Sequence, residues 1–367
     1  MKGQWIGEYS GTVEGKTMVN IEEVGDIYEA VAYITPYDQN IPSSIAKITT
    51  FNKNFEQQVK ASLKSIHPLT WQQCEWDEIK DRYPENTIHS NEADVHLKLD
   101  KEKLHIYAKS DKGVEFSSIL AKPPEDSKSK IIGHEISWAK FMDGISKFSK
   151  SNFLFRGQAK PWKLRTSFHR RDRYIINKFV DNDVRQLHKR LSAMTSHYFD
   201  LSITEQYGAF INLIQHHGYP TPLLDWTYSP YVAAFFAFRD WPVGYSGKAT
   251  CRVYMFDSGA WQEDFRQIAL LESPYPYLSV LDFIAIENPR IVPQQSVTTV
   301  TNVDDIEAHV IKGEKLKKKE YFYAYDIPAN ERDTVMKDLR FMGITAGSLF
   351  PGIDGVCEEL RERYFEK

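Results

Sequence analysis

The stretch Asn152-Phe-Leu-Phe-Arg-Gly-Gln-Ala159 carries an arginine at the end of an apolar run. The apolar residues predict a β-strand that ends at the guanidinium of Arg156. Arginine presents five donors in a planar fork, which suits a phosphate or a carboxylate. Gly157 would let a ligand or another backbone approach closely. A structural salt bridge is the alternative role for Arg156, and the residues alone leave both open.

Basic side chains are concentrated around this strand. Between Asn152 and Arg173 there are seven of them and one acid, Asp172, in a chain of formal net charge −4. Such a patch suits a dinucleotide pyrophosphate or a nucleic-acid backbone. The basic residues are Arg156, Lys160, Lys163, Arg165, Arg170, Arg171 and Arg173.

A second candidate motif is Leu-Leu-Asp-Trp-Thr-Tyr-Ser-Pro, residues 223–230. Asp225, Thr227 and Ser229 alternate along it, so an extended chain places them on one face. Each has a structural alternative. Ser229 can cap the helix that Pro230 begins, and Asp225 and Thr227 can bond the adjacent turn.

Two further polar positions are candidates. His216 precedes His217 and Gly218 near a predicted helix end, where a histidine often complements the helix dipole. Gln294 lies in residues 283–300, a segment that predicts a strand, a turn and a strand, and its alternative role is a solvated turn amide. The spacing of the adjacent histidines does not fit a metal site, so no metal is expected.

Composition and motifs exclude several classes of protein. Gly-Thr-Val-Glu-Gly-Lys-Thr, residues 11–17, is one residue too short for a phosphate-binding loop, and no G-x-G-x-x-G fingerprint is present. The three cysteines are too scattered for a disulfide framework or a zinc site. No run is apolar enough for a signal peptide or a membrane span, so a soluble, cytoplasmic protein without membrane contact is expected.

The chain divides by composition into an α+β arrangement. Residues 1–121 are β-rich and predict a small sandwich or a barrel-like module, with a helix over residues 52–66 because Phe55, Val59 and Leu63 are spaced by four. Residues 122–130 read as a linker with two prolines and many charges. Residues 131–367 alternate helical and strand patterns, which predicts a mixed α/β domain.

Taken together, four segments resemble the FRG-domain family, named for its Phe/Tyr-Arg-Gly motif: Phe-Leu-Phe-Arg-Gly-Gln, the segment from Gln215 to Phe238, residues 288–296 and residues 343–355. The resemblance spans about residues 135–360 and does not cover the β-rich module. Three positions depart from the family pattern. Pro222 stands where arginine is common, His217 where an aromatic residue is common, and Ser296 where glycine is common.

The same order of motifs is more distantly similar to the ADP-ribosyltransferase fold. The family's first strand ends in Arg-Gly, and its second motif is Ser-Thr-Ser, where this chain has Asp225-Trp226-Thr227. The glutamate of its third motif is missing, with Gln294 at the corresponding place. The resemblance implies NAD as substrate. The residues it assigns to NAD binding are Arg156, Gly157, Gln158, Thr227, Tyr228, Ser229 and Tyr231, and those it assigns to catalysis are Arg156, Asp225, Thr227, Gln294 and His216.

The expected function is therefore an NAD-dependent ADP-ribosyltransferase, acting as a bacterial toxin or phage-defence effector on nucleic acid (RNA or DNA) or protein. In that chemistry an arginine clamps the diphosphate while a carboxylate stabilises the oxocarbenium-like ribose. Two alternatives remain open: a non-catalytic module that binds a nucleotide or nucleic acid, and a hydrolase that uses His216 and Asp225. The β-rich module would recognise a target, hold an inhibitory partner protein or sense infection.

Overall fold

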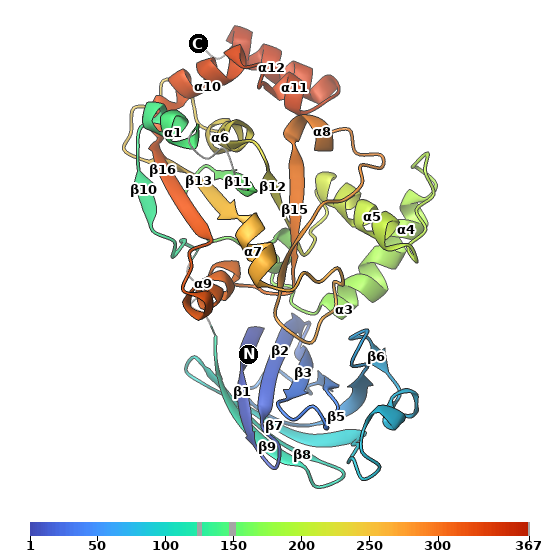
Figure 1. Cartoon of the computed structure of the whole chain (residues 1–367). Helices are drawn as coiled ribbons and strands as arrows, with labels where there is room; N and C mark the ends of the chain where they lie inside the picture. The colour runs from blue at the N-terminus through green and yellow to red at the C-terminus, as the bar shows by residue number, and fades with distance from the viewer. Residues whose placement is uncertain (123–126, 147–151, 366–367) are drawn as a thin grey trace.

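The computed structural model describes residues 1–122, 127–146 and 152–365. The chain forms two β-sheets, a nine-stranded sheet near the N-terminus and a seven-stranded sheet in the remainder. Figure 1 shows the first sheet below the second, with the helices gathered around the upper one. The molecule is therefore an α+β protein, as its sequence predicts.

The N-terminal sheet closes into a barrel. Its order is β4-β3-β2-β1-β9-β8-β7-β5-β6, and β4 also pairs with β5, so all strands but the short β6 form a closed ring. Every pairing in it is antiparallel. The strands are β1 (Gly3–Gly11), β2 (Gly15–Val24), β3 (Ile27–Pro36), β4 (Ser44–Thr49), β5 (Glu56–Ile66), β6 (Gln73–Cys74), β7 (Glu92–Asp100), β8 (Lys103–Ser110) and β9 (Glu115–Ala121). The barrel-like prediction is confirmed.

The helix predicted over residues 52–66 is wrong. This segment is mainly strand β5, in which Gln57, Val59 and Ala61 are buried and the residues between them are exposed. A spacing of four fits a helix turn, but it is also two repeats of the strand period, so Val59 and Leu63 satisfy both. The barrel decides for the strand because β5 closes the ring between β4 and β7.

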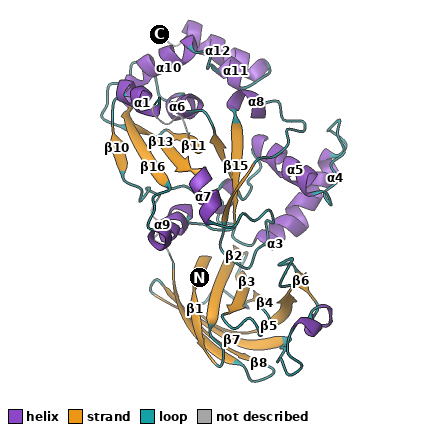
Figure 2. Ribbon diagram, viewed as in Figure 1, coloured by secondary structure: helices purple, strands orange, loops and turns teal. Residues whose placement is uncertain are grey.

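The C-terminal sheet is mixed, with the order β10-β16-β13-β11-β12-β15-β14. Strand β10 runs parallel to β16, and the other neighbours are antiparallel. Its strands, coloured by type in Figure 2, are β10 (Gly133–Glu135), β11 (Phe153–Gln158), β12 (Leu223–Thr227), β13 (Thr250–Asp257), β14 (Leu278–Leu281), β15 (Ser296–Thr301) and β16 (Phe322–Pro328).

Helices cover both faces of this sheet. The helices are α1 (Trp138–Ile145), α2 (Ser167–Arg170), α3 (Ile176–Lys178), α4 (Arg185–Leu191), α5 (Thr204–His216), α6 (Pro230–Phe238), α7 (Ser258–Asp264), α8 (Ile291–Gln294), α9 (Ile306–Lys317), α10 (Arg332–Phe341), α11 (Ala346–Leu349) and α12 (Ile353–Phe365). Short helical turns at Trp76–Glu78, Lys80–Arg82, Phe179–Val184 and Ala329–Glu331 complete the secondary structure.

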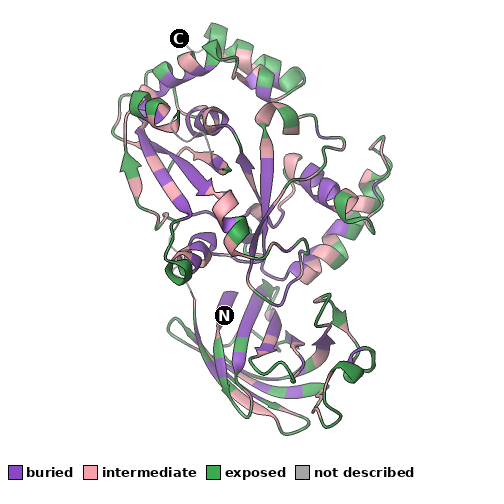
Figure 3. Cartoon of the chain, in the orientation of Figure 1, coloured by how far each residue is buried: buried purple, intermediate pink, exposed green. Residues whose placement is uncertain are grey.

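Alternate residues of each strand point into different cores. Phe155 and Val253 pack with α1, α6, α10 and α11 on one face, whereas Leu154 and Tyr254 pack with α7 and α9 on the other. A third cluster joins α5 to the end of the sheet around β12 and β15. Figure 3 shows that α6 is mostly buried and α12 mostly exposed. Burial on both faces explains why β11 and β13 read as nearly continuous apolar runs.

The barrel and the C-terminal region are docked by polar contacts. The carboxylate of Glu22 accepts hydrogen bonds from the backbone amides of Tyr174 and Ile175 at 2.7 and 2.8 Å. The side chain of Gln4 donates to the carbonyl of Asn302 at 2.6 Å and accepts from the amide of Asp304 at 3.0 Å. These hydrogen bonds join residues far apart in the sequence, so no local sequence pattern predicts them.

Among the residues that the structure describes, no helix has both the length and the apolar character needed to cross a membrane. Within the same residues, no three histidine, cysteine or acidic side chains are grouped so that they could hold a metal ion. Cys74, Cys251 and Cys357 are free thiols.

Candidate functional site

The candidate site begins where the C-terminal sheet divides. Strands β11 and β12 pair at a single position, Phe155 with Thr227, before they separate. Beyond it, Arg156 extends across the gap and its Nη1 donates a 2.7 Å hydrogen bond to the backbone carbonyl of Asp225. The arginine therefore links two half-sheets at the place where their backbone ladder ends.

The surroundings of Arg156 disfavour its charged form. Burial lowers its pKa to about 10, the charge of Asp225 opposes that decrease and the charge of Arg170 adds to it. The Nε of Arg156 is buried without a hydrogen-bond partner among the described residues, and so is the Oε1 of Gln158, two positions along the strand. Buried polar atoms are rarely left unpaired, so both are available to a ligand or an ordered water.

Gly157 has a structural explanation of its own. A Cβ at this position would lie 1.8 Å from the backbone oxygen of Ala233 in helix α6. The close approach predicted for this glycine is therefore an approach of another backbone. The contact fixes helix α6 against β11 and sets the position of the neighbouring Arg156.

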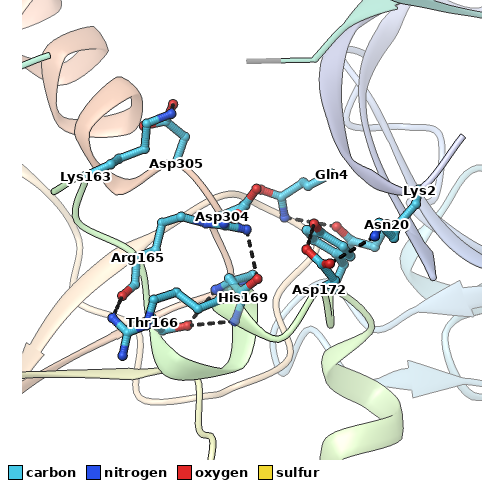
Figure 4. A network of polar contacts seen from close by, with 12 residues as sticks. Lys2, Gln4, Asn20, Lys163, Arg165, Thr166, His169, Asp172, Asp304 and Asp305 are labelled. Atoms are coloured by element: carbon cyan, nitrogen blue, oxygen red, sulfur yellow. Dashed lines mark hydrogen bonds and ion pairs between the residues drawn. The ribbon is translucent and has the colours of Figure 1, made fainter. Parts of the chain in front are cut away.

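A cavity of about 770 Å³ opens beside this strand end. It lies between the two regions of the chain, because Lys2 and Lys122 of the barrel contribute to its wall. Figure 4 shows part of the polar network around it. The charged lining residues are Lys2, Lys122, Arg156, Lys163, Arg165, Arg170, Asp172, Asp240, Asp304 and Asp305.

Most of these charges are paired. Lys163 contacts Asp305 at 3.1 Å, and Arg165 contacts Asp304 at 2.6 Å. Lys2 contacts Asp172 at 2.9 Å (Figure 4).

The two remaining arginines of the wall differ from these pairs. Arg156 and Arg170 form no ion pair within the part of the chain that the structure describes. Arg170 donates instead to the carbonyl of Arg165 at 2.8 Å. Burial and the charge of Arg170 lower the pKa of Arg156, and burial together with the charges of Arg165 and Arg171 lowers the pKa of Arg170.

The hydroxyl groups of Thr227 and Ser229 form hydrogen bonds with backbone groups. Thr227 is buried, donates to the carbonyl of Gln294 at 2.7 Å and accepts from the amide of Ser229 at 3.0 Å. Ser229 accepts from the amide of Val232 at 3.2 Å, so it is the N-cap of α6. The side chain of Gln294 donates to the carbonyl of Leu349 at 2.9 Å.

Of the two strands predicted over residues 283–300, only the second, β15, is present, and the short helix α8 precedes it. Gln295, at φ 46°, ends α8 in the left-handed region before β15 begins. The third motif is therefore a helix end that contacts the last residue of α11.

The remaining candidates do not line the cavity. The Asp225 carboxylate accepts a hydrogen bond from Gln215, and the Nδ1 of His216 contacts the amide of Asn288. Tyr231 packs edge-on against Trp138, and Tyr228 is 47% exposed. Of the predicted site residues, Arg156, Gly157 and Gln158 line the cavity, and the others do not.

No sequence motif predicted the lining residues outside the basic patch. Lys2 and Lys122 belong to the barrel, and Asp304 and Asp305 follow strand β15. No motif connects positions so far apart, and only the docking of the two regions brings them together. The basic patch was visible, but three of its members, Lys163, Arg165 and Arg173, are held in ion pairs.

The fold and this site define an α+β protein that carries a basic cavity beside an arginine-bearing strand end. Residues 151–242, here termed the FRG region, match the family model of the FRG domain. No curated protein matches the chain. A redesigned β-barrel of known structure aligns with 34% of this chain and 91% of its own at 10% identity, and its TM-score of 0.23 does not establish a shared fold.

Proposed function

We propose that the cavity of the FRG region binds a nucleotide through its diphosphate, with NAD as the candidate ligand. Arg156 and Arg170 bind the phosphate oxygens, and Gln158 accepts a hydrogen bond from a sugar hydroxyl or a base amine. The observation that carries this proposal is the pair of arginines without an anionic partner in a cavity of about 770 Å³.

The physical reason is the free-energy cost of keeping these arginines charged when no phosphate is bound to them. Burial and the charge of the exposed Arg170 disfavour the charged guanidinium of Arg156, and a diphosphate would offset this cost with charge-assisted, bidentate hydrogen bonds. Each such bond contributes about 1.5–3 kcal/mol, which corresponds to roughly ten- to hundredfold in affinity. The size of the cavity falls within the usual range of small-molecule sites.

Equilibrium titration with ADP-ribose, NAD and inorganic pyrophosphate tests this proposal. Arg170→Gln should weaken binding of all three about tenfold or more, because Arg170 is exposed and its loss leaves the fold intact. Arg171→Gln is the matched control, since Arg171 is the exposed next residue and does not line the cavity. Arg156→Gln should weaken binding further.

Two results would contradict nucleotide binding. One is an affinity that is unchanged in Arg170→Gln and Arg156→Gln variants that retain the wild-type melting temperature. The other is binding of duplex or single-stranded RNA or DNA with no binding of the mononucleotides. That outcome would assign the cavity to a nucleic-acid backbone.

A second candidate function is transfer of ADP-ribose from bound NAD to nucleic acid or protein. Its specific support is the series of contacts at the divided sheet, where Arg156 bonds the carbonyl of Asp225 and Thr227 bonds that of Gln294. Transfer would require the Asp225 carboxylate, which accepts a hydrogen bond from Gln215 and does not line the cavity, to reach the positive ribose that forms as nicotinamide leaves. A chain with this activity would serve as a toxin or phage-defence effector.

Nicotinamide release separates the two candidates. With NAD and a cell lysate, RNA or DNA as acceptor, transfer predicts labelled acceptor and free nicotinamide, both lost in Asp225→Asn. Binding of NAD with no nicotinamide release would reject transfer and keep nucleotide binding. Release that survives in Asp225→Asn would reject the role of this carboxylate.

A further inference from the structure

The interior of the barrel is filled in one part and hollow in another. Trp5, Tyr28, Leu104 and Leu120 pack together as part of the barrel core and do not line the cavity inside it. The cavity has a volume of about 370 Å³. Its wall includes five alanines from five strands, namely Ala32, Ala46, Ala61, Ala93 and Ala108.

The strand register places these alanines opposite one another. Ala32 pairs with Ala46 across β3 and β4, and Ala61 pairs with Ala93 across β5 and β7. An eight-stranded barrel is just wide enough for its side chains to fill or to hold one small ligand. Methyl groups do not reach across it, so the pairing of small residues leaves space that a core of leucines would close.

The wall of this cavity carries no aspartate, glutamate, lysine or arginine among the described residues. A charged ligand would lose its hydration and find no carboxylate, lysine or arginine as partner there, only neutral groups and the imidazole of His89, which costs several kcal/mol, as an order of magnitude. The cavity therefore selects for a neutral molecule. It reaches the surface at one end, where the exposed loop residues Thr12, Asn40 and Asn86 line it.

One polar group inside the cavity lacks a partner. Tyr9 is 3% exposed, lines the cavity and has a hydroxyl with no hydrogen bond among the described residues. Buried tyrosine hydroxyls usually find a partner. Tyr33, another buried tyrosine of the barrel, donates to Asn177 at 2.9 Å. Burial raises the pKa of Tyr9, so its phenol stays protonated and remains a donor.

We propose that the barrel binds a neutral, mostly apolar small molecule whose carbonyl or other acceptor takes a hydrogen bond from Tyr9. The alanine-lined space supplies apolar contact, the uncharged wall excludes ions, and the phenol fixes the orientation of the ligand. This site lies within the first 116 residues of the chain and is independent of the nucleotide proposed for the FRG region.

The test uses two neutral fluorescent probes with the full-length chain. PRODAN carries a carbonyl acceptor and its emission reports hydrogen bonding to that carbonyl, whereas N-phenyl-1-naphthylamine has no carbonyl. Both should bind saturably with increased, blue-shifted emission. Tyr9→Phe should weaken PRODAN about two- to tenfold, the range of one neutral hydrogen bond, and leave N-phenyl-1-naphthylamine unchanged. Tyr37→Phe is the control, because its hydroxyl bonds Glu8 outside the cavity.

A second set of variants tests the place of binding. Ala61→Leu fills the cavity and should remove binding of both probes, while Ser62→Leu, on the outer face of the same strand, should not. Ala46→Leu serves if Ala61→Leu fails to fold, as judged by circular dichroism. Probe binding that persists in a folded Ala61→Leu or Ala46→Leu protein, or no saturable binding to the wild type, would overturn the proposal. Equal PRODAN affinity of wild type and Tyr9→Phe would overturn the role of Tyr9.

Discussion

The two cavities of this chain differ in size, in charge and in how they are built. The barrel cavity of about 370 Å³ has an uncharged wall of apolar and small polar side chains. The cavity of about 770 Å³ at Arg156 is lined by ten charged residues. The first suits a neutral apolar molecule, and the second suits a phosphate.

The difference in construction matters as much as the difference in charge. The barrel cavity takes all its lining residues from positions 9–116, in the closed sheet and the loops that join its strands. The basic cavity combines Lys2 and Lys122 of the barrel with residues up to Asp305. One site should therefore survive the separation of the two regions, and the other should not.

The largest effect on stability is expected when alanine replaces a glycine, and it should differ between Gly157 of the divided sheet and Gly7 of the barrel. In Gly157→Ala the new Cβ meets the backbone of α6, which cannot move without breaking the core, so a loss of about 3 kcal/mol is expected. In Gly7→Ala of the barrel the Cβ meets the end of the Leu120 side chain, which can rotate, so the loss should be less than half as large. Urea denaturation of both variants measures this. Equal losses would show that the divided sheet is no more rigid than the barrel.

A smaller effect is expected where the two regions meet. Glu22→Ala leaves the buried amides of Tyr174 and Ile175 without an acceptor, at a cost of about 2–3 kcal/mol. Calorimetry should show the two regions melting at separate temperatures. Binding of ADP-ribose should weaken while binding of PRODAN stays the same.

The exposed neighbour Glu23, which pairs with Lys53 outside the interface, provides the control Glu23→Ala. Retained ADP-ribose affinity in a Glu22→Ala protein whose regions melt separately would mean that the basic cavity does not depend on docking.

The smallest effect concerns pH and belongs to the FRG region. His169 is fully buried, and burial together with the charge of Arg165 lowers its pKa to about 3. Unfolding restores an ordinary pKa of about 6.5. Below that pH the unfolded chain binds a proton that the folded protein excludes, so stability falls as pH falls. Between pH 7 and pH 5 the loss should be about 1–2 kcal/mol.

Urea denaturation at pH 7 and pH 5 measures this loss, and His169→Gln should reduce the difference between the two values. An unchanged difference in the variant would assign the pH dependence to other groups. In the Glu22→Ala variant, the barrel and the FRG region should unfold separately. If the loss of stability between pH 7 and pH 5 were seen in the unfolding of the barrel, its assignment to the FRG region would be wrong.

Local patterns predicted much of the secondary structure. Pro230 after Ser229 predicted the start of α6 and its cap, and both are present. In the β-rich module, the alternation within residues 94–100 and 103–110 predicted two strands, and β7 and β8 are present there. These predictions succeed because a cap or a strand face depends on residues within a few positions of each other. The helix predicted over residues 52–66 failed where one spacing fits two periods.

The site was predictable only at its first strand. Arg156, Gly157 and Gln158 line the cavity, but Asp225, Thr227, Gln294 and His216 do not. A hydroxyl or amide has the same sequence signature whether it faces a ligand or caps a helix. Thr227 and Ser229 cap the helix because the backbone amides at the turn into α6 need hydrogen-bond acceptors, and these two hydroxyl groups provide them.

The sequence by itself determined the α+β class, the β-rich start of the chain and the arginine at the end of β11, since each follows from local periodicity and residue type. The tertiary structure alone decided that β11 and β12 separate after one pair, that Lys2 joins the basic cavity and that five alanines face a common space. Strand pairing and docking join residues tens to hundreds of positions apart. Their energies depend on burial and register, which no short stretch of sequence encodes.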